Sequence, residues 1–302
     1  MQQKRSRVRE SAHERTCEMK EIIKLARQLI SSYAEASSPQ LSQCGDFLQS
    51  HKRAQTATKL YISSAMTTDS IIILIEHGLI WDAISLFRSL LEGTARFCYL
   101  LSTTTEEEEI KRFHEYEEVL SGKSMMSLEQ PVAKMKKGHL YKHDKTDAYL
   151  DRIEVNVKEI AQEISGEAAE VKRKWNFFNL SHALRTECPE WAVMADQWEL
   201  RYATANFAIH KDGVIVGADI THWTKEPSPD NPLVKVWAPS LLSFCVGLVR
   251  DRLVVLMRKF DLDYSVLRDV MKRNLDFAKL ATDMELEARE KLEHQEDDNE
   301  LT

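Results

Sequence analysis

Residues 81–101 read WDAISLFRSLLEGTARFCYLL, a stretch whose apolar side chains recur at helical spacing. On a helix that turns by about 100° per residue, these side chains form one broad face. The face consists of Ala83, Ile84, Phe87, Leu90, Leu91, Thr94, Cys98 and Leu101. A helix with such a wide apolar face packs in the interior of a globular protein. The stretch therefore predicts a core helix that begins near Ile80.

A narrow polar stripe borders this apolar face and is formed by Trp81, Arg88, Glu92 and Tyr99. Arg88 and Glu92 are four residues apart, a spacing that allows a charge-assisted pair on one side of a helix. Two interpretations follow. The pair is an ordinary salt bridge at the edge of the core, or Arg88 is a partly buried arginine that Glu92 orients to receive an anion.

Composition favours an all-α, soluble protein. The chain has 302 residues, of which 43% are hydrophobic and 29% are charged, with only nine glycines and seven prolines. Folds rich in β-turns need more glycine and proline than this. No run of eighteen apolar residues and no secretory signal are found, so we expect a cytoplasmic protein without a membrane span. The five cysteines are scattered, which predicts reduced thiols rather than disulfides or a zinc site.

The charge is unevenly distributed. The formal net charge is -7, yet residues 4–27 are basic and residues 285–300 are strongly acidic. These ends either pair with each other or remain solvated. Since the protein is acidic overall, it can bind nucleic acid only through a local group of Lys and Arg side chains.

Hydrophobic periodicity predicts a multi-helix bundle. The expected helices span residues 15–36, 53–76, 80–101, 147–164, 167–184, 190–210, 239–259 and 264–294, with a further one from residue 106. Residues 122–145 are basic and lack periodicity, so we expect a mobile loop, and residues near 213–237 predict a short extended or hairpin excursion. The expected division is a basic helical segment (1–48), a helical core domain (49–260), and a C-terminal amphipathic helix that frays into an acidic tail (261–302).

A second polar stripe lies in residues 198–213, which read WELRYATANFAIHKDG. Tyr202, Asn206 and His210 are spaced four residues apart, so their side chains share one face of the helix. A hydroxyl, an amide and an imidazole in one row can form a continuous series of hydrogen bonds. His210 lies in the last turn, where the helix dipole favours its protonated form. The row is either a polar network that fixes helix packing or part of a binding site.

These two helices carry a resemblance. Together with KWNFFNLSHALRTECPEW, residues 174–191, they resemble an uncharacterised family of bacterial helical proteins known only as a domain of unknown function. That family pairs an Arg-x-x-x-Glu helix with a later Tyr-x-x-x-Ser-x-x-x-His helix end, and here Asn206 stands at the serine position. The resemblance extends over approximately residues 50–260. It implies that the two polar stripes face each other.

A more distant resemblance is to HEPN proteins, small helical bundles that include RNA-cleaving toxins of bacterial defence systems. Their motif is an arginine, commonly followed by asparagine, with a histidine four to six residues further on. Residues 205–210 read ANFAIH, so Asn206 and His210 fit the motif while Ala205 stands where the arginine is expected. This resemblance implies an RNA-targeting toxin in which Arg88 supplies the missing cation from the other helix.

Two functions remain open at this point, and whether the protein is an enzyme is undecided. In the first, the protein cleaves RNA without a metal or cofactor: His210 and Arg88 are catalytic, while Glu92, Tyr202 and Asn206 bind and orient. In the second, a non-catalytic adaptor binds a nucleotide, another small anion or a protein partner. A homodimer is possible in either case. No phosphate-binding loop, dinucleotide fingerprint or zinc-protease motif is present in the sequence.

Overall fold

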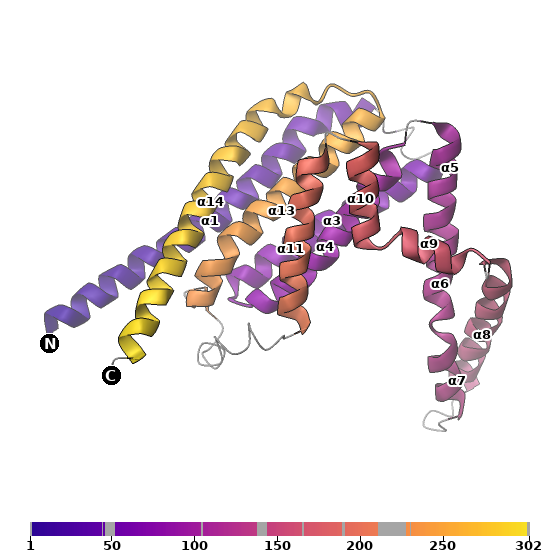
Figure 1. Ribbon diagram of the computed structural model, residues 1–302, viewed down its shortest axis with the longest axis horizontal. Helices are drawn as coiled ribbons and strands as arrows, with labels where there is room; N and C mark the ends of the chain where they lie inside the picture. Colours follow the sequence, from indigo (N-terminus) through magenta and orange to yellow (C-terminus); the bar gives the residue numbers. More distant parts are fainter. Residues whose placement is uncertain are drawn as a thin grey trace. The chain divides into compact units, whose positions relative to one another are not determined.

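The computed structural model describes most of the chain. The described residues are 2–43, 45, 52–103, 105–137, 144–164, 166–188, 191–210, 228–229 and 231–300. Within these helices, the side chains of residues 2–18, 137, 144–147, 163, 207–210 and 293–300 lie outside the description. The described part is all-α, with no strand in it, as the sequence predicts (Figure 1).

The chain divides into two compact units, Met1–Cys98 with Val193–Thr302, and Tyr99–Ala192. The first unit therefore combines both ends of the chain with the helices that carry the two polar stripes. Its helices are α1 (Gln2–Gln43), α3 (Lys52–Glu76), α4 (Ile80–Leu101), α11 (Ala192–His210), α13 (Pro232–Lys259) and α14 (Arg268–Glu300).

Helix α13 is the centre of the first unit. It packs against α14, α1 and α3, and α14 runs antiparallel beside α1 in Figure 1. Among the described residues, α13 alone is long and apolar enough to cross a membrane, but 67% of its most apolar window is buried inside the protein. A buried core helix meets the same criterion, and the packing of α13 agrees with that role.

Several expected boundaries in this unit are wrong, and α1 already begins at Gln2 rather than at residue 15. Helix α1 continues past Pro39 to Gln43, although the proline removes one backbone hydrogen bond and its ring crowds the carbonyl of Glu35. Helix α13 begins at Pro232 rather than Pro239, because the Asn231 side chain accepts from the Leu233 amide and caps it. Residues 232–237 are therefore helical, not extended, whereas residues 211–227 lie outside the description. Helix α14 continues to Glu300, so its acidic end is helical rather than frayed.

The second unit is also helical. It contains α5 (Glu106–His114), a π-helical turn (Glu115–Leu120), α6 (Ser121–Met126), α7 (Glu129–Lys137), α8 (Asp144–Ile164), α9 (Ala168–Lys174) and α10 (Phe177–Glu187). Thr105 caps α5, because its hydroxyl accepts from the Glu108 amide at 3.3 Å.

The predicted loop at 122–145 is wrong over most of its length. Helices α6, α7 and the start of α8 occupy it, and only residues 138–143 lie outside the description. Gly122 has a packing role in this region, since a β-carbon there would lie 2.8 Å from side-chain atoms of Ile160 and Ile164. This glycine allows α6 to pack closely on α8 rather than breaking the chain. The expected helix at 167–184 is divided into two where Asn176 caps α10.

Candidate functional site

The two polar stripes meet in the first unit. The Tyr202 hydroxyl of α11 donates to Glu92 Oε1 of α4 at 2.8 Å. The same hydroxyl accepts from Arg88 Nε at 3.3 Å and from Arg88 Nη2 at 3.1 Å. The expected convergence of Arg88 and Glu92 with the Tyr202 row is therefore confirmed. We call Arg88, Glu92, Arg96 and Tyr202 the α4–α11 cluster.

Arg96 is the member of the cluster that the sequence analysis overlooked. Its Nη2 lies 3.4 Å from Glu92 Oε2, while Arg88 Nε lies 3.4 Å from Glu92 Oε1. Arg88, Glu92 and Arg96 follow one another at intervals of four, so the spacing that indicated the first pair also indicates the second. Two guanidinium groups against one carboxylate leave the cluster with a net positive charge, which favours an anion.

The cluster is partly open to solvent. The side chains of Arg88 and Glu92 are 29% and 26% exposed, whereas Tyr202 is buried at 7%. Burial, followed by the hydrogen bond to Glu92, raises the pKa of Tyr202. The hydroxyl therefore stays protonated at neutral pH and remains a donor. Among the described residues, no partner is recorded for Arg88 Nη1, which leaves one face of the guanidinium available.

Helix α13 fixes the two helices that carry the cluster. Its buried Asp251 accepts a side-chain hydrogen bond from Trp198, one turn before Tyr202 on α11. Its buried Arg252 donates to Thr94 on α4 at 2.8 Å, two residues after Glu92. Neighbouring residues of one core helix thus hold α4 and α11, and this sets how Tyr202 meets Glu92.

The rest of the predicted Tyr202 row is described only in part. Asn206 lies one turn beyond Tyr202, and its Oδ1 is buried with no hydrogen-bond partner among the described residues. An unsatisfied buried amide oxygen costs about 1–3 kcal/mol, so it marks a place where a donor fits. The backbone of α11 includes His210, but the side chain of His210 lies outside the description.

A second cation lies on the neighbouring side of α11. The guanidinium of Arg201 stacks 4.3 Å from the Phe244 ring centre, and burial lowers the pKa of Arg201. Its one direct hydrogen bond recorded in the described part of the chain is a long one of 3.5 Å to the Ser240 hydroxyl. The adjoining cavity of about 20 Å³ has room for about one water molecule. Arg201 is therefore half-buried against an aromatic ring and lies outside the α4–α11 cluster.

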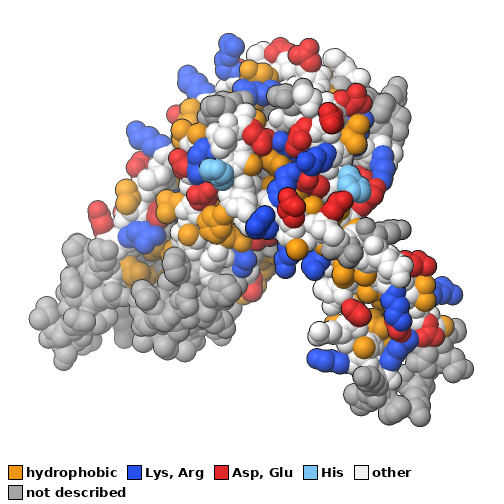
Figure 2. All heavy atoms as spheres, turned by 45° about the vertical axis from the view of Figure 1, so that its right-hand side comes forward, with side chains coloured by type: hydrophobic (Ala, Val, Ile, Leu, Met, Phe, Trp, Pro, Cys, Tyr) orange, Lys and Arg blue, Asp and Glu red, His pale blue; other side chains and the backbone are white. Residues whose placement is uncertain are grey.

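The described part of the chain contains no group of three side chains that could hold a metal ion. His139 and His143, which are four residues apart and so have the spacing of two metal ligands on a helix, lie outside the described part. Cys98 and Cys245 are buried free thiols, and burial raises the pKa of Cys245 to about 12. Figure 2 shows Lys, Arg, Asp and Glu side chains interspersed over the described surface of one face.

Comparison with known families adds one finding. A family of unknown function, DUF5677, matches residues 55–220, which is more than half of the chain. The chain belongs to DUF5677. Neither the curated proteins nor the solved structures gave a significant match. The DUF5677 region contains all of α4 and α11, and hence the whole α4–α11 cluster, whereas α1, α13 and α14 lie beyond it.

Proposed function

We propose that the α4–α11 cluster binds a phosphodiester of RNA and that the protein cleaves RNA there without a metal. The observation that supports this most is the convergence of Arg88, Glu92, Arg96 and Tyr202 from two helices into a partly open, net cationic group. Phosphate oxygens are recognised by guanidinium and hydroxyl donors in this way.

Each residue has a role in this proposal. Arg88 binds the phosphate and stabilises the negative charge that grows on its oxygens during the reaction. Tyr202 and Asn206 orient the phosphate. Glu92, held by Arg96, keeps Arg88 in place, which makes Glu92 a positioning residue.

His210 is the proposed general base. It takes the proton of a ribose 2′-hydroxyl, and the 2′-oxygen attacks phosphorus while the bond to the 5′-oxygen breaks. The leaving 5′-oxygen takes up a proton. The products are a 2′,3′-cyclic phosphate and a 5′-hydroxyl.

One observation favours a second function, which is phosphate or nucleotide binding without cleavage. Ala205 stands where the RNA-cleaving relatives suggested by the HEPN resemblance carry arginine. Arg88 is also already bonded to Tyr202 and paired with Glu92, as it would be in a stable recognition site.

The deciding experiment incubates the full chain with single-stranded RNA in the presence of a chelator and analyses the product ends. We expect 2′,3′-cyclic phosphates from the wild type and at least about a hundredfold slower cleavage with Arg88→Ala or His210→Ala. The matched controls are Arg152→Ala on α8 and His182→Ala on α10, whose side chains are exposed. RNA binding that is lost in Arg88→Ala, without cleavage by the wild type, would establish the second function. Neither binding nor cleavage would reject both.

A further inference from the structure

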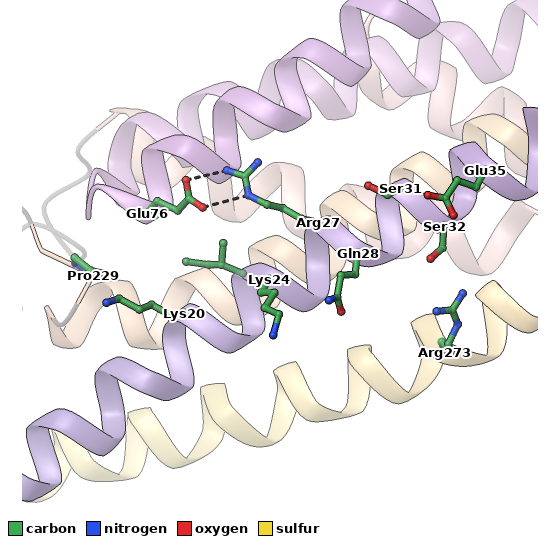
Figure 3. Close-up of a pocket in the computed structure, with 11 residues that line it drawn as sticks. Lys20, Lys24, Arg27, Gln28, Ser31, Ser32, Glu35, Glu76, Pro229 and Arg273 are labelled. Atoms are coloured by element: carbon green, nitrogen blue, oxygen red, sulfur yellow. Dashed lines mark hydrogen bonds and ion pairs between the residues drawn. The ribbon is translucent and has the colours of Figure 1, made fainter.

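A groove with a volume of about 740 Å³ follows α1 in the first unit, and none of its lining residues belongs to the α4–α11 cluster. Figure 3 shows that its lining side chains come from α1, the end of α3, α14 and Pro229 before α13. Sites for small molecules in proteins have volumes of about 300–1,000 Å³. The groove is therefore large enough for a small molecule.

The groove has a charge gradient along α1. Lys20, Lys24 and Arg27 lie at one end, hydroxyl and amide side chains follow, and Glu35 lies at the other end. From Lys20 to Glu35 the helix rises by about 22 Å. In a protein with a net charge of -7, this gathering of cations opposes the overall charge.

Arg27 is the fixed element of the basic end. It donates to both carboxylate oxygens of Glu76 on α3, through Nε at 3.2 Å and Nη2 at 2.8 Å. This bidentate pair is largely neutral and holds the wall of the groove in place. Lys20 and Lys24 then supply the local positive charge, since Lys24 has only an exposed contact of 3.5 Å with Glu21.

The far end differs in chemistry. Ser31 and Ser32 contribute hydroxyls, Glu35 contributes a carboxylate, and Arg273 projects from α14 on the opposite side of α1 from the Arg27–Glu76 pair. Glu35 and Arg273 together leave this end without a net charge, so it attracts a ligand that is anionic over its whole length, such as a nucleic-acid strand, less than the lysine end does. The carboxylate of Glu35 accepts hydrogen bonds from hydroxyl or amino groups.

We propose that this groove binds a small molecule that carries a chain of phosphates. The phosphates lie at Lys20 and Lys24, and any uncharged polar portion of the ligand extends toward Ser31, Ser32 and Glu35. A nucleoside triphosphate and an inorganic triphosphate share this chemistry. The inference does not depend on the proposed RNA site, because the two groups of residues are separate.

Calorimetric titration of the full chain with ATP, and separately with inorganic tripolyphosphate, tests the proposal. We expect saturable binding of at least one, and a loss of affinity of at least about tenfold in Lys20→Ala/Lys24→Ala. The matched control is Lys59→Ala/Lys279→Ala, which removes two exposed lysines outside the groove and leaves affinity within about twofold. Ser31→Glu, which adds a negative charge to the lining, also weakens binding.

The outcomes distinguish a nucleotide from an inorganic chain of phosphates as the ligand. Tighter binding of ATP than of tripolyphosphate supports a nucleotide, and equal binding supports recognition of the phosphate chain alone. Absence of saturable binding by both, or an equal loss in the control variant, overturns the proposal. A twelve-nucleotide RNA that displaces ATP and depends on the same lysines would also overturn it, in favour of a nucleic-acid surface. Loss of ATP affinity in Lys20→Ala/Lys24→Ala but not in Lys59→Ala/Lys279→Ala assigns the binding to the groove, so failure here differs from failure of the proposed function.

Discussion

Two arginines on different units of this protein show how differently the same side chain is used. In the second unit, Arg112 is only 4% exposed. It donates to Glu108 at 3.0 Å, to the Tyr99 carbonyl at 2.6 Å, to the Ser102 hydroxyl at 3.2 Å and to Glu187. Its guanidinium also lies 3.7 Å from the Tyr99 ring centre. Four of the five N–H donors of Arg112 are therefore bonded within a buried network, which leaves little capacity for a ligand.

Arg88 in the first unit is less buried and less satisfied. It is 29% exposed, and both of its hydrogen bonds go to one hydroxyl group, that of Tyr202. The two arginines therefore differ in their remaining hydrogen-bonding capacity and not in having a carboxylate nearby, since both have one.

The second unit contains another charged side chain that is buried and hydrogen-bonded, that of Glu115. Glu115 begins the π-helical turn, and it accepts from Lys174 at 2.9 Å and from Trp175 Nε1 at 2.7 Å. Although π-helical turns are frequent at functional sites, here the turn carries a buried carboxylate with both oxygens bonded. Its role is structural.

The largest expected effect is that of Arg112→Ala. The substitution leaves a cavity and removes the shared partner of Glu108 and Glu187, and we expect it to destabilise the protein by about 3–5 kcal/mol. Denaturant unfolding measures this. Arg152→Ala, an exposed arginine on the same unit, serves as the control and should change stability by less than about 0.5 kcal/mol. A loss of stability below about 1 kcal/mol for Arg112→Ala would show that the hydrogen bonds of Arg112 contribute little to folding in solution.

The second expected effect is that of Asp251→Asn, which tests how the α4–α11 cluster is held in place. The substitution preserves size but leaves Arg250 and Arg252 without their buried countercharge. We expect a loss of about 2–4 kcal/mol, together with a change in Tyr202 fluorescence or NMR shift. Unchanged Tyr202 signals would show that α13 does not position the α4–α11 cluster.

A smaller effect on stability is expected for Arg88→Ala. Because the group is partly exposed and forms bonds to a single hydroxyl, its removal should cost less than about 1 kcal/mol. Phosphate or RNA binding should nevertheless be lost. Thermal melts of Arg88→Ala and Arg112→Ala compare the two losses of stability. Equal losses would show that Arg88 is as important for folding as Arg112.

The smallest effect concerns acid stability in the second unit. Hydrogen bonds from Lys136 and Lys158 lower the pKa of Glu154 to about 2. A lowered pKa in the folded state stabilises the protein above the ordinary glutamate pKa of about 4.3, and this contribution disappears as the pH falls toward 2. The difference in stability between wild type and Glu154→Gln should therefore be present at pH 7 and vanish near pH 2. A difference independent of pH would contradict this assignment.

The sequence predicts part of this molecule well because periodic patterns report on core packing. The face of residues 81–101 and the spacing of Arg88 and Glu92 indicated α4 and its pair, and the resemblance indicated contact with Tyr202. The errors at 122–145 and at the end of α1 arise where apolar periodicity is weak or a proline interrupts it. Gly122 permits close packing on Ile160 and Ile164, and Pro39 lies near a helix end.

Long-range partners are absent from any local pattern. The bonds of Arg112 to Tyr99 and Glu187 join residues 13 and 75 positions apart, so spacing within one helix does not reveal them. The groove along α1 is equally non-local, because Glu76 and Arg273 come from other helices. Arg96 was the exception, since its interval of four from Glu92 was visible in the sequence.

The most direct test of the open α4–α11 cluster is an NMR titration of the arginine side-chain Nε–H signals with a short 2′-O-methyl RNA. This RNA offers phosphodiesters but has no 2′-hydroxyl proton, so it binds without being cleaved. The account predicts that the Arg88 signal shifts until the RNA site is full, while the signal of the buried Arg112 does not move. An Arg88 signal that does not move at saturating RNA would contradict the account, and would make the cluster a structural network like that of Arg112.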